Sequence, residues 1–130
     1  MAKVSDVMST GLLTVEPTMA LDEAARQMND RQVGAVLVLT SGRVSGILTE
    51  RDVLRAVATG QLAGTRVAAW MTGDPETIGP DASTGHAASV MIHGGFRHLP
   101  VVDDANRPLG IVSIRDLMRV TLDDETPRGA

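Results

Sequence analysis

The sequence contains the same seven-residue motif twice, once in each half. The copies read GILTERD and GIVSIRD. In each copy a glycine and two apolar residues precede a hydroxyl residue, Thr49 or Ser113, and an aspartate, Asp52 or Asp116, follows three positions later. This pattern predicts a buried strand that ends at the hydroxyl residue, where a helix then begins.

The motif has two structural interpretations. In the first it is a capping box, in which the hydroxyl oxygen accepts a hydrogen bond from a backbone N–H and the aspartate reaches back. In the second it is an anion and ribose site, because a helix N-terminus attracts phosphate and a carboxylate accepts hydrogen bonds from ribose hydroxyls. The presence of two copies in the same context favours the binding site.

The motif is part of a longer internal repeat. A shift of 63 residues aligns Val4 with Val67, Met8 with Met71, Thr14 with Thr77, Pro17 with Pro80, Ala24 with Ala87, and Met28 with Met91. A shift of 64 aligns the two motifs, because a turn of the second half has one extra residue. We therefore expect two repeats, 1–62 and 63–122, related by a pseudo-two-fold axis and followed by a flexible acidic tail, 123–130.

Hydrophobic periodicity assigns the same elements to both repeats. Helical spacing of apolar residues predicts helices at 21–31 and 84–93, and unbroken apolar runs predict buried strands at 35–39 and 99–102. The other predicted elements are extended segments at 12–15 and 76–78, strands at 44–48 and 109–112, helices at 51–58 and 115–120, and a linker at 59–66. Each repeat reads strand, helix, strand, strand, helix, which indicates an α/β fold. The methionines, including Met118, are expected to fill the core. Trp70 is expected to anchor the core or an interface, with stacking on a purine as the alternative.

Composition argues against several classes of function. Trp70 and Phe96 are the only aromatic residues in a chain of net charge −4, so nucleic-acid binding is not expected. The chain has no cysteine and no apolar run of signal-peptide or membrane-span length. Its histidines lack metal-site spacing, and Ser113 lacks the partners of a catalytic nucleophile. We expect a cytoplasmic protein that is not an enzyme, does not enter a membrane, and has no metal and no catalytic cofactor.

The order of elements resembles the CBS domain, which occurs in tandem pairs called Bateman modules. The resemblance covers residues 4–120 and rests on DVMST…TVEP, AAWMTGDPETIGP, RHLPVVD and the two seven-residue motifs. It implies two packed CBS repeats with an adenosine-containing ligand in the clefts between them, one potential site per repeat. It also implies a homodimer that acts as a regulatory sensor of AMP, ADP or ATP and signals to an unidentified protein partner.

The resemblance also implies roles for particular residues. The aspartates of the two motifs are expected to bind ribose, and the hydroxyl residues and nearby basic side chains to bind phosphate. The backbone around Thr14–Val15 and Thr77–Ile78, and the starts of the two long strands, are expected to face adenine. The expected ligand-binding residues are Thr14, Val15, Gly34, Ala35, Thr49, Arg51, Asp52, Thr77, Ile78, Arg97, His98, Leu99, Pro100, Ser113, Arg115 and Asp116.

The two sites are not expected to be equal. Arg97 and His98 precede the long strand of the second repeat, whereas Gly34 and Ala35 occupy the matching positions of the first. The resemblance implies that basic side chains here contact phosphate. We therefore expect the motif of the second repeat to bind phosphorylated adenosine more tightly, unless Arg97 crosses the pseudo-two-fold axis. Protonation of His98 would make the affinity depend on pH near neutrality.

Two other classes of function stay open at this point. One is a ligand-free structural or protein-interaction module, in which helix capping is the only role of the motif. The other is a small enzyme such as a nucleotide hydrolase, which needs a nucleophile or metal that the sequence does not display. Within the binding class, S-adenosylmethionine, NAD, a cyclic dinucleotide and nucleic acid are alternative ligands.

Overall fold

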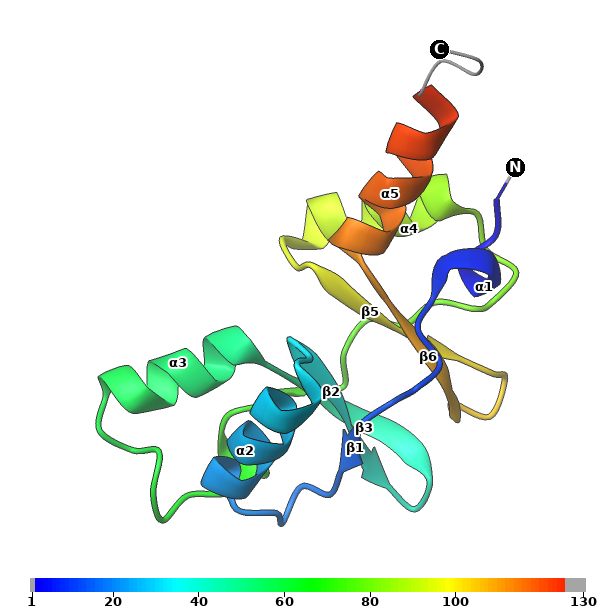
Figure 1. Cartoon of the computed structure of the whole chain (residues 1–130). Helices are drawn as coiled ribbons and strands as arrows, with labels where there is room; N and C mark the ends of the chain where they lie inside the picture. The colour runs from blue at the N-terminus through cyan, green and yellow to red at the C-terminus, as the bar shows by residue number, and fades with distance from the viewer. Residues whose placement is uncertain (1, 126–130) are drawn as a thin grey trace.

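The computed structural model describes residues 2–125, with side chains described to Val120, and the expected tail residues 126–130 lie outside this range. The elements are α1 (Val4–Val7), β1 (Thr14–Val15), α2 (Leu21–Arg31), β2 (Ala35–Thr40), β3 (Arg43–Thr49), α3 (Glu50–Ala58), the 3-10 helix η1 (Val67–Ala69), β4 (Thr72–Gly73), α4 (Thr84–Gly94), β5 (His98–Val102), β6 (Pro108–Ser113) and α5 (Ile114–Glu125). They form two similar halves (Figure 1), which confirms the expected α/β fold of two repeats. Within residues 2–125, no helix combines the length and apolar composition that crossing a bilayer requires.

Both halves contain a sheet of the same topology. β1 to β4 form one sheet in that order, in which β1 is parallel to β2 and the other neighbours are antiparallel. β5 and β6 are antiparallel, and two bridges extend them: Ile78 pairs with Val101 in parallel, and Ser9 pairs with Ile111 in antiparallel. Since Ile78 corresponds to Val15 of β1, the second half repeats the arrangement of the first.

The first long helix of each repeat, α2 or α4, ends in a left-handed residue. Gln32 after α2 has φ of 54°, and Gly95 after α4 has φ of 72°. At the start of α4, the Ser83 hydroxyl accepts a hydrogen bond of 3.1 Å from the N–H of His86. Both helices are therefore confirmed, and α4 is one residue longer than the sequence predicted.

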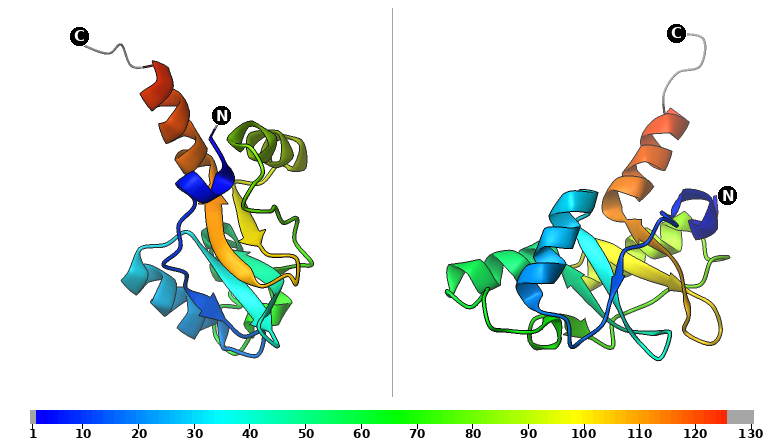
Figure 2. Two further views of the ribbon diagram at one scale, coloured as in Figure 1. Left: turned by 90° about the vertical axis from the view of Figure 1, so that its right-hand side faces the viewer. Right: turned by 60° about the horizontal axis from the view of Figure 1, so that its bottom comes forward.

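The opening segment of each repeat packs in the other half. α1 contacts α5 and β6 (Figures 1 and 2), and Val4 is buried in the second core, where its N–H donates to the Ala82 carbonyl at 2.8 Å. Conversely, Val67 of η1 is buried beside Leu21 in the first core and donates to the Met19 carbonyl at 2.9 Å. Each folded half therefore contains residues of both repeats, and the chain crosses between the halves after each opening segment.

A shared apolar layer joins the two halves. Leu37, Val44 and Ile47 form a buried cluster against which Ile111 of the second half packs. At one end of the layer, the Val44 N–H donates to the Asn106 carbonyl at 3.0 Å, and the Asn106 side-chain amide donates to the Val44 carbonyl at 2.9 Å. Burial and these two hydrogen bonds together fix the relative position of the halves.

Two features differ from the sequence-based expectation, and one agrees with it. α5 continues to Glu125 instead of ending at Val120. Met118 does not point inward: it is 55% exposed, whereas Leu117 is 5% exposed and packs in the second core. Neighbouring positions of a helix point about 100° apart, so only one of the two can face the core.

Trp70 packs against the first core as predicted and donates a hydrogen bond from its indole N–H.

The glycine of each seven-residue motif accommodates a methionine of the other repeat. A Cβ on Gly110 would lie 2.5 Å from Met8 Sδ and 2.9 Å from the Ser9 carbonyl oxygen. A Cβ on Gly46 would likewise lie 2.5 Å from Met71 Sδ. Because these distances are shorter than van der Waals contact, the exchanged segments pack this closely only against glycine.

Replacing Gly110 with alanine should therefore lower the free energy of unfolding by about 1–3 kcal/mol, because the added methyl group overpacks the contact with Met8. Urea unfolding followed by circular dichroism measures the change. Gly79→Ala is the control, since nothing lies within 4 Å of a Cβ built there. Equal unfolding midpoints for Gly110→Ala and the wild type would contradict the packing role of this glycine.

Candidate functional site

Two pockets of similar size lie between the halves. The first encloses about 730 Å³ and includes Asp116; we call it the Asp116 pocket. The second encloses about 740 Å³ and includes Asp52; we call it the Asp52 pocket. Each is lined by residues of both repeats. Volumes of this size are typical of small-molecule sites.

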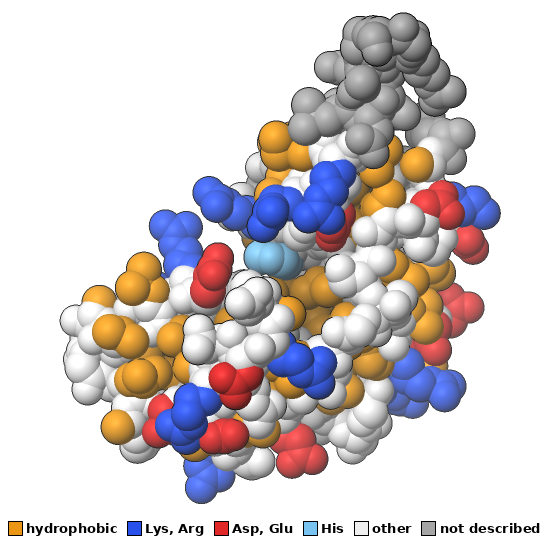
Figure 3. Space-filling model, viewed as in Figure 1, with side chains coloured by type: hydrophobic (Ala, Val, Ile, Leu, Met, Phe, Trp, Pro, Cys, Tyr) orange, Lys and Arg blue, Asp and Glu red, His pale blue; other side chains and the backbone are white. Residues whose placement is uncertain are grey.

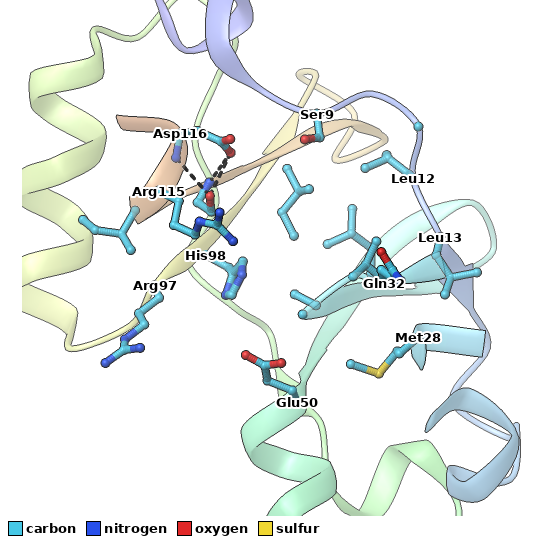
Figure 4. Close-up of a pocket in the computed structure, with 18 of the residues that line it drawn as sticks. Ser9, Leu12, Leu13, Met28, Gln32, Glu50, Arg97, His98, Arg115 and Asp116 are labelled. Carbon is cyan, nitrogen blue, oxygen red and sulfur yellow. Dashed lines mark hydrogen bonds between the residues drawn. The ribbon is translucent and has the colours of Figure 1, made fainter. Parts of the chain in front are cut away.

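The Asp116 pocket has an apolar side and a polar side (Figure 4). Leu12 and Leu13, from the segment before β1, and Met28 of α2 lie on the apolar side. Arg115 and Asp116, at the start of α5, lie on the opposite side of the cavity. Such a cavity fits a ligand with an apolar ring at one end and polar groups at the other.

The Asp116 carboxylate is held by the start of its own helix. Its Oδ2 accepts hydrogen bonds from the Ser113 N–H at 2.8 Å and the Ser113 hydroxyl at 2.9 Å, and the Asp116 N–H donates to Ser113 Oγ at 3.1 Å. This is the predicted capping box. Among the described residues, Oδ1 accepts no hydrogen bond and lies 3.8 Å from Arg119 Nη1. One carboxylate oxygen is therefore open to the pocket.

The equivalent carboxylate of the Asp52 pocket is more fully engaged. Asp52 Oδ2 accepts hydrogen bonds from the Thr49 N–H at 2.9 Å and the Thr49 hydroxyl at 3.1 Å, again within a capping box. Its Oδ1 accepts a third hydrogen bond from Arg55 Nη2 at 2.9 Å. Both oxygens of Asp52 thus already have partners within the protein.

Some residues line both pockets. Among the described residues these are Glu50, Arg97 and His98. Gly34 and Ala35 line the Asp116 pocket and not the Asp52 pocket. Arg97 therefore lines the pockets on both sides of the pseudo-two-fold axis, which is the exception that the sequence left open, and each pocket contains an arginine from the start of β5.

The two pockets differ in net charge. The charged side chains of the Asp116 pocket are Arg97, Arg115, Arg119, Glu50 and Asp116. Those of the Asp52 pocket are Arg51, Arg97, Glu50, Asp52, Asp74 and Glu76. Arginines thus outnumber carboxylates in the first pocket, whereas carboxylates outnumber arginines in the second. Figure 3 shows basic side chains gathered beside a histidine at the hollow between the halves. The Asp116 pocket is the one whose charge favours an anion.

His98 is tuned by burial and by three charged neighbours. Burial lowers the pKa of His98 below its ordinary value of 6.5; Glu50 and Asp116 oppose this shift, and Arg97 adds to it. At pH 7 the imidazole is therefore mainly neutral. A phosphate bound beside it would raise the pKa of His98 again, because a negative charge stabilises the imidazolium.

The structure brings most of the expected site residues to the pockets. Those that line a pocket are Gly34, Ala35, Thr49, Arg51, Asp52, Arg97, His98, Ser113, Arg115 and Asp116. Those outside both linings are Thr14, Val15, Thr77, Ile78, Leu99 and Pro100. Of this second group, Val15, Ile78 and Leu99 have side chains buried in the two cores. The expectation that the backbone at Thr14–Val15 and Thr77–Ile78 faces adenine stays a prediction.

Two short segments upstream of the expected ones line the pockets instead. Residues 11–13 line the Asp116 pocket, and residues 74–76 line the Asp52 pocket. We call them the straps, because the chain crosses there from one half to the other. Met28, Glu50 and Arg119 also line the Asp116 pocket and were not among the residues expected from the sequence. The repeat pattern does not show that the opening segments pack in opposite halves, which is what brings these residues to the pockets. The 63-residue shift does show that the two straps are equivalent.

The two repeats match a known family. The model of the CBS domain matches residues 4–59 and 67–123. The chain belongs to the CBS domain family. It is a tandem CBS pair, as expected from the sequence. The CBS domain-containing protein YhcV of Bacillus subtilis is 35% identical over 131 residues, which cover 100% of this chain and 93% of YhcV.

Solved CBS pairs have the same fold. The CBS domain pair of protein MJ0100, in complex with 5′-methylthioadenosine and S-adenosyl-L-methionine, has a TM-score of 0.90 and 25% identity over 96% of this chain and 99% of that one. CBSX2 of Arabidopsis thaliana, in complex with AMP, has a TM-score of 0.84 and 23% identity over 96% and 99%. CBS pairs of this kind are ligand-binding regulatory modules.

The lowered pKa of His98 makes stability depend on pH. As the pH falls below about 6.5, the unfolded chain binds a proton at His98 more readily than the folded protein does, so the wild type should lose stability. His98→Gln should show a weaker pH dependence of the unfolding free energy, measured by urea unfolding at a series of pH values. The exposed His86 supplies the control, His86→Gln. Equal pH dependence in His98→Gln and the wild type would contradict this account.

Proposed function

We propose that the chain is a non-catalytic regulatory module that binds an adenine nucleotide, AMP, ADP or ATP, in the Asp116 pocket. The observation that carries the proposal is a single cavity with an apolar side, a carboxylate with one open oxygen, and a helix start flanked by arginines. Adenine, ribose and phosphate respectively need such surroundings. The nucleotide is a regulatory ligand, and the proposal includes no catalytic cofactor.

Capping and ribose binding use different atoms of Asp116. Oδ2 holds the helix start through Ser113, whereas Oδ1 lies 3.8 Å from Arg119 Nη1, beyond ordinary hydrogen-bond distance. A ribose hydroxyl can therefore donate to Oδ1 without breaking the cap. The cap also fixes the carboxylate in one orientation, which reduces the entropy that binding would cost.

The phosphate end of the ligand would meet the start of α5. This helix has 12 residues, and its start carries a partial positive charge. In its first turn the Ile114 N–H donates to the Arg97 carbonyl at 2.9 Å and the Asp116 N–H to Ser113 Oγ at 3.1 Å, so within the described residues the Arg115 N–H is the one left for a phosphate. Arg97 and Arg115 line the same pocket, and within the described residues neither forms an ion pair. Both guanidinium groups are thus available to a phosphate.

The hydroxyl of the pocket is arranged to bind and not to react. Ser113 Oγ donates its proton to Asp116 Oδ2 at 2.9 Å, inside the cap. A serine nucleophile instead directs its proton to a base that can accept it during attack, such as His98. We therefore propose binding without turnover, and protein-dependent ATP hydrolysis would overturn this part of the proposal.

A ligand in the Asp116 pocket would contact both repeats at once. The strap 11–13 belongs to the first repeat, and the start of α5 belongs to the second. A ligand that orders this cleft changes the free energy of forming any protein–protein interface whose geometry depends on the relative position of the halves. We propose that a cytoplasmic protein partner reads the signal at such an interface.

Asp116→Ala should weaken AMP binding by about ten- to a hundredfold, because it removes a hydrogen bond to a charged group worth roughly 1.5–3 kcal/mol. Asp52→Ala is the matched control: it removes an equivalent cap and should have the smaller effect on AMP. Calorimetric titration measures both affinities. A larger loss in Asp52→Ala would contradict the choice of pocket.

The same titration separates the alternative functions. If the folded wild type binds none of AMP, ADP and ATP, the ligand-free structural or interaction module becomes the better account. Tighter binding of S-adenosylmethionine, NAD or a cyclic dinucleotide than of AMP, ADP and ATP would support the proposed pocket but identify a different ligand.

We further propose that the chain forms a homodimer through apolar helix surfaces. Leu54 and Val57 of α3 are 66% and 52% exposed, and Ile92 of α4 and Met118 of α5 are 72% and 55% exposed. Leu54 and Met118 occupy equivalent positions of the two repeats, so each half presents an apolar patch. Exposed apolar patches of this kind favour association.

The double variant Leu54→Asp/Met118→Asp should shift the protein from dimer to monomer, because the interface would have to bury two unpaired carboxylates. Light scattering coupled to gel filtration measures the mass. Thr10→Asp/Gln61→Asp places the same charges at exposed sites off these patches and should leave the dimer intact. A wild type that is monomeric at high concentration would contradict the proposal.

A further inference from the structure

The Asp116 pocket indicates how a nucleotide would be oriented in its counterpart. In the Asp116 pocket the strap residues Leu12 and Leu13 lie opposite the start of α5 (Figure 4). Because the two repeats are equivalent, the strap 74–76 and the start of α3 are the corresponding sides of the Asp52 pocket. A nucleotide placed there as in the proposed function has its base at the strap and its phosphate at the helix start. The inference below rests on the proposed function for this orientation.

The Asp52 pocket contains an aromatic side chain that its counterpart lacks. Phe96 lines the Asp52 pocket, whereas Val33 occupies the equivalent position in the Asp116 pocket. Phe96 is half-buried against the second core, and a Cβ on Gly94 would overlap its ring, so the ring is held against the end of α4. A fixed aromatic ring stacks on a base of any kind. Phe96 therefore favours a base as the occupant without distinguishing one base from another.

Two carboxylates stand on the strap of the Asp52 pocket. Asp74 and Glu76 line this pocket, whereas the equivalent residues Gly11 and Leu13 are uncharged. The Asp74 N–H donates to the Ser45 carbonyl at 3.1 Å, which ties the strap to β3. Within the described residues neither carboxylate forms an ion pair. The base end of the Asp52 pocket thus offers hydrogen-bond acceptors, where the base end of the Asp116 pocket is apolar.

We propose that the Asp52 pocket binds a guanine nucleotide, whose base donates hydrogen bonds to the strap carboxylates. An ionised carboxylate only accepts hydrogen bonds, and its two oxygens match two neighbouring donors. Guanine presents such a pair, the N1–H and the 2-amino group. Adenine presents its 6-amino donor beside N1, which is an acceptor, so N1 and a carboxylate oxygen would face each other with no proton between them. The strap therefore distinguishes the two purines by their hydrogen-bonding edges.

The charge at the other end of the pocket is compatible with a phosphate. Arg51 and Arg97 line the pocket at the start of α3, and within the described residues neither forms an ion pair. The Asp52 carboxylate is balanced by Arg55 at 2.9 Å, which leaves Glu50 as the unbalanced carboxylate of the helix start. The chain would then respond to two nucleotides, an adenine nucleotide in the Asp116 pocket and a guanine nucleotide in the Asp52 pocket.

Three probes test the proposal: GMP, IMP and AMP. They carry the same ribose and phosphate charge, so the ratio of their affinities reports on the base edge and not on the field of the pocket. IMP has the N1–H of GMP but lacks the 2-amino group. Because the strap carboxylates are exposed, we expect a moderate preference, with GMP binding about tenfold more tightly than AMP and IMP between them.

NMR titration of the ¹⁵N-labelled wild type assigns each affinity to a pocket. Amides of residues 49–52 and of Asp74 and Glu76 should shift at about tenfold lower concentrations of GMP than of AMP. Amides of residues 11–13 and 113–116 should not show this preference, because strap 11–13 has no side-chain acceptor. AMP that shifts the amides of the Asp52 pocket at the same concentration as GMP, or at a lower one, would overturn the proposal.

Neutralising the strap provides a second test. In Asp74→Asn/Glu76→Gln each carboxylate becomes an amide, which has one acceptor and one donor and can pair with either purine. The preference of the Asp52 pocket for GMP should therefore fall from about tenfold to nearly none. Glu16→Gln/Asp104→Asn makes the same change in net charge at exposed residues outside both pockets and should keep the preference. Equal preference in the strap variant and the control would overturn the proposal.

The outcomes separate this inference from the proposed function. If AMP binds the Asp116 pocket and GMP leaves the amides of the Asp52 pocket unchanged, the inference alone is wrong. If none of the three probes binds either pocket of the folded protein, the proposed function fails as well, and this inference fails with it.

Discussion

The structure depends on the exchange of the opening segments between the two repeats. Val4 and Val67 each fill the core of the opposite half, and Met8 packs on Gly110 at a distance that leaves no room for a Cβ. Because each opening segment starts in one half and the next strand lies in the other, the chain has to cross the cleft between them. The straps 11–13 and 74–76 are these crossings, and each forms a wall of one pocket. The packing of the cores therefore also builds the candidate sites.

Helix capping occupies one carboxylate oxygen at the start of α3 and of α5, and the two copies of the motif differ in whether the second oxygen is engaged. Asp116 caps its helix with one oxygen and leaves the other open, whereas Arg55 engages the second oxygen of Asp52. The straps also differ in charge, because residues 11–13 are uncharged whereas residues 74–76 include Asp74 and Glu76. The same repeated motif thus lines two pockets of different charge, because the charge resides in a few side chains around the motif.

Much of the fold could be predicted from the sequence because its determinants are local. Apolar periodicity gave α2 and α4 within a residue, and the motif spacing gave both capping boxes. Each opening segment could pack in the core of its own half or in the core of the other half. The repeat pattern in the sequence is compatible with either arrangement. For this reason the sequence did not reveal that the straps, just upstream of Thr14–Val15 and Thr77–Ile78, line the pockets. The sequence also left open whether Arg97 crosses the pseudo-two-fold axis, and the structure places Arg97 in the lining of both pockets.

The central claim is that one nucleotide site is assembled from both repeats. An NMR titration of the ¹⁵N-labelled chain with AMP tests this claim most directly, because every backbone amide reports separately. The account predicts that amides of residues 113–116 at the start of α5 shift together with those of the strap 11–13 and Gly34, at one common ligand concentration. Shifts confined to one repeat, or shifts of residues 49–52 and 74–76 in place of these, would contradict it.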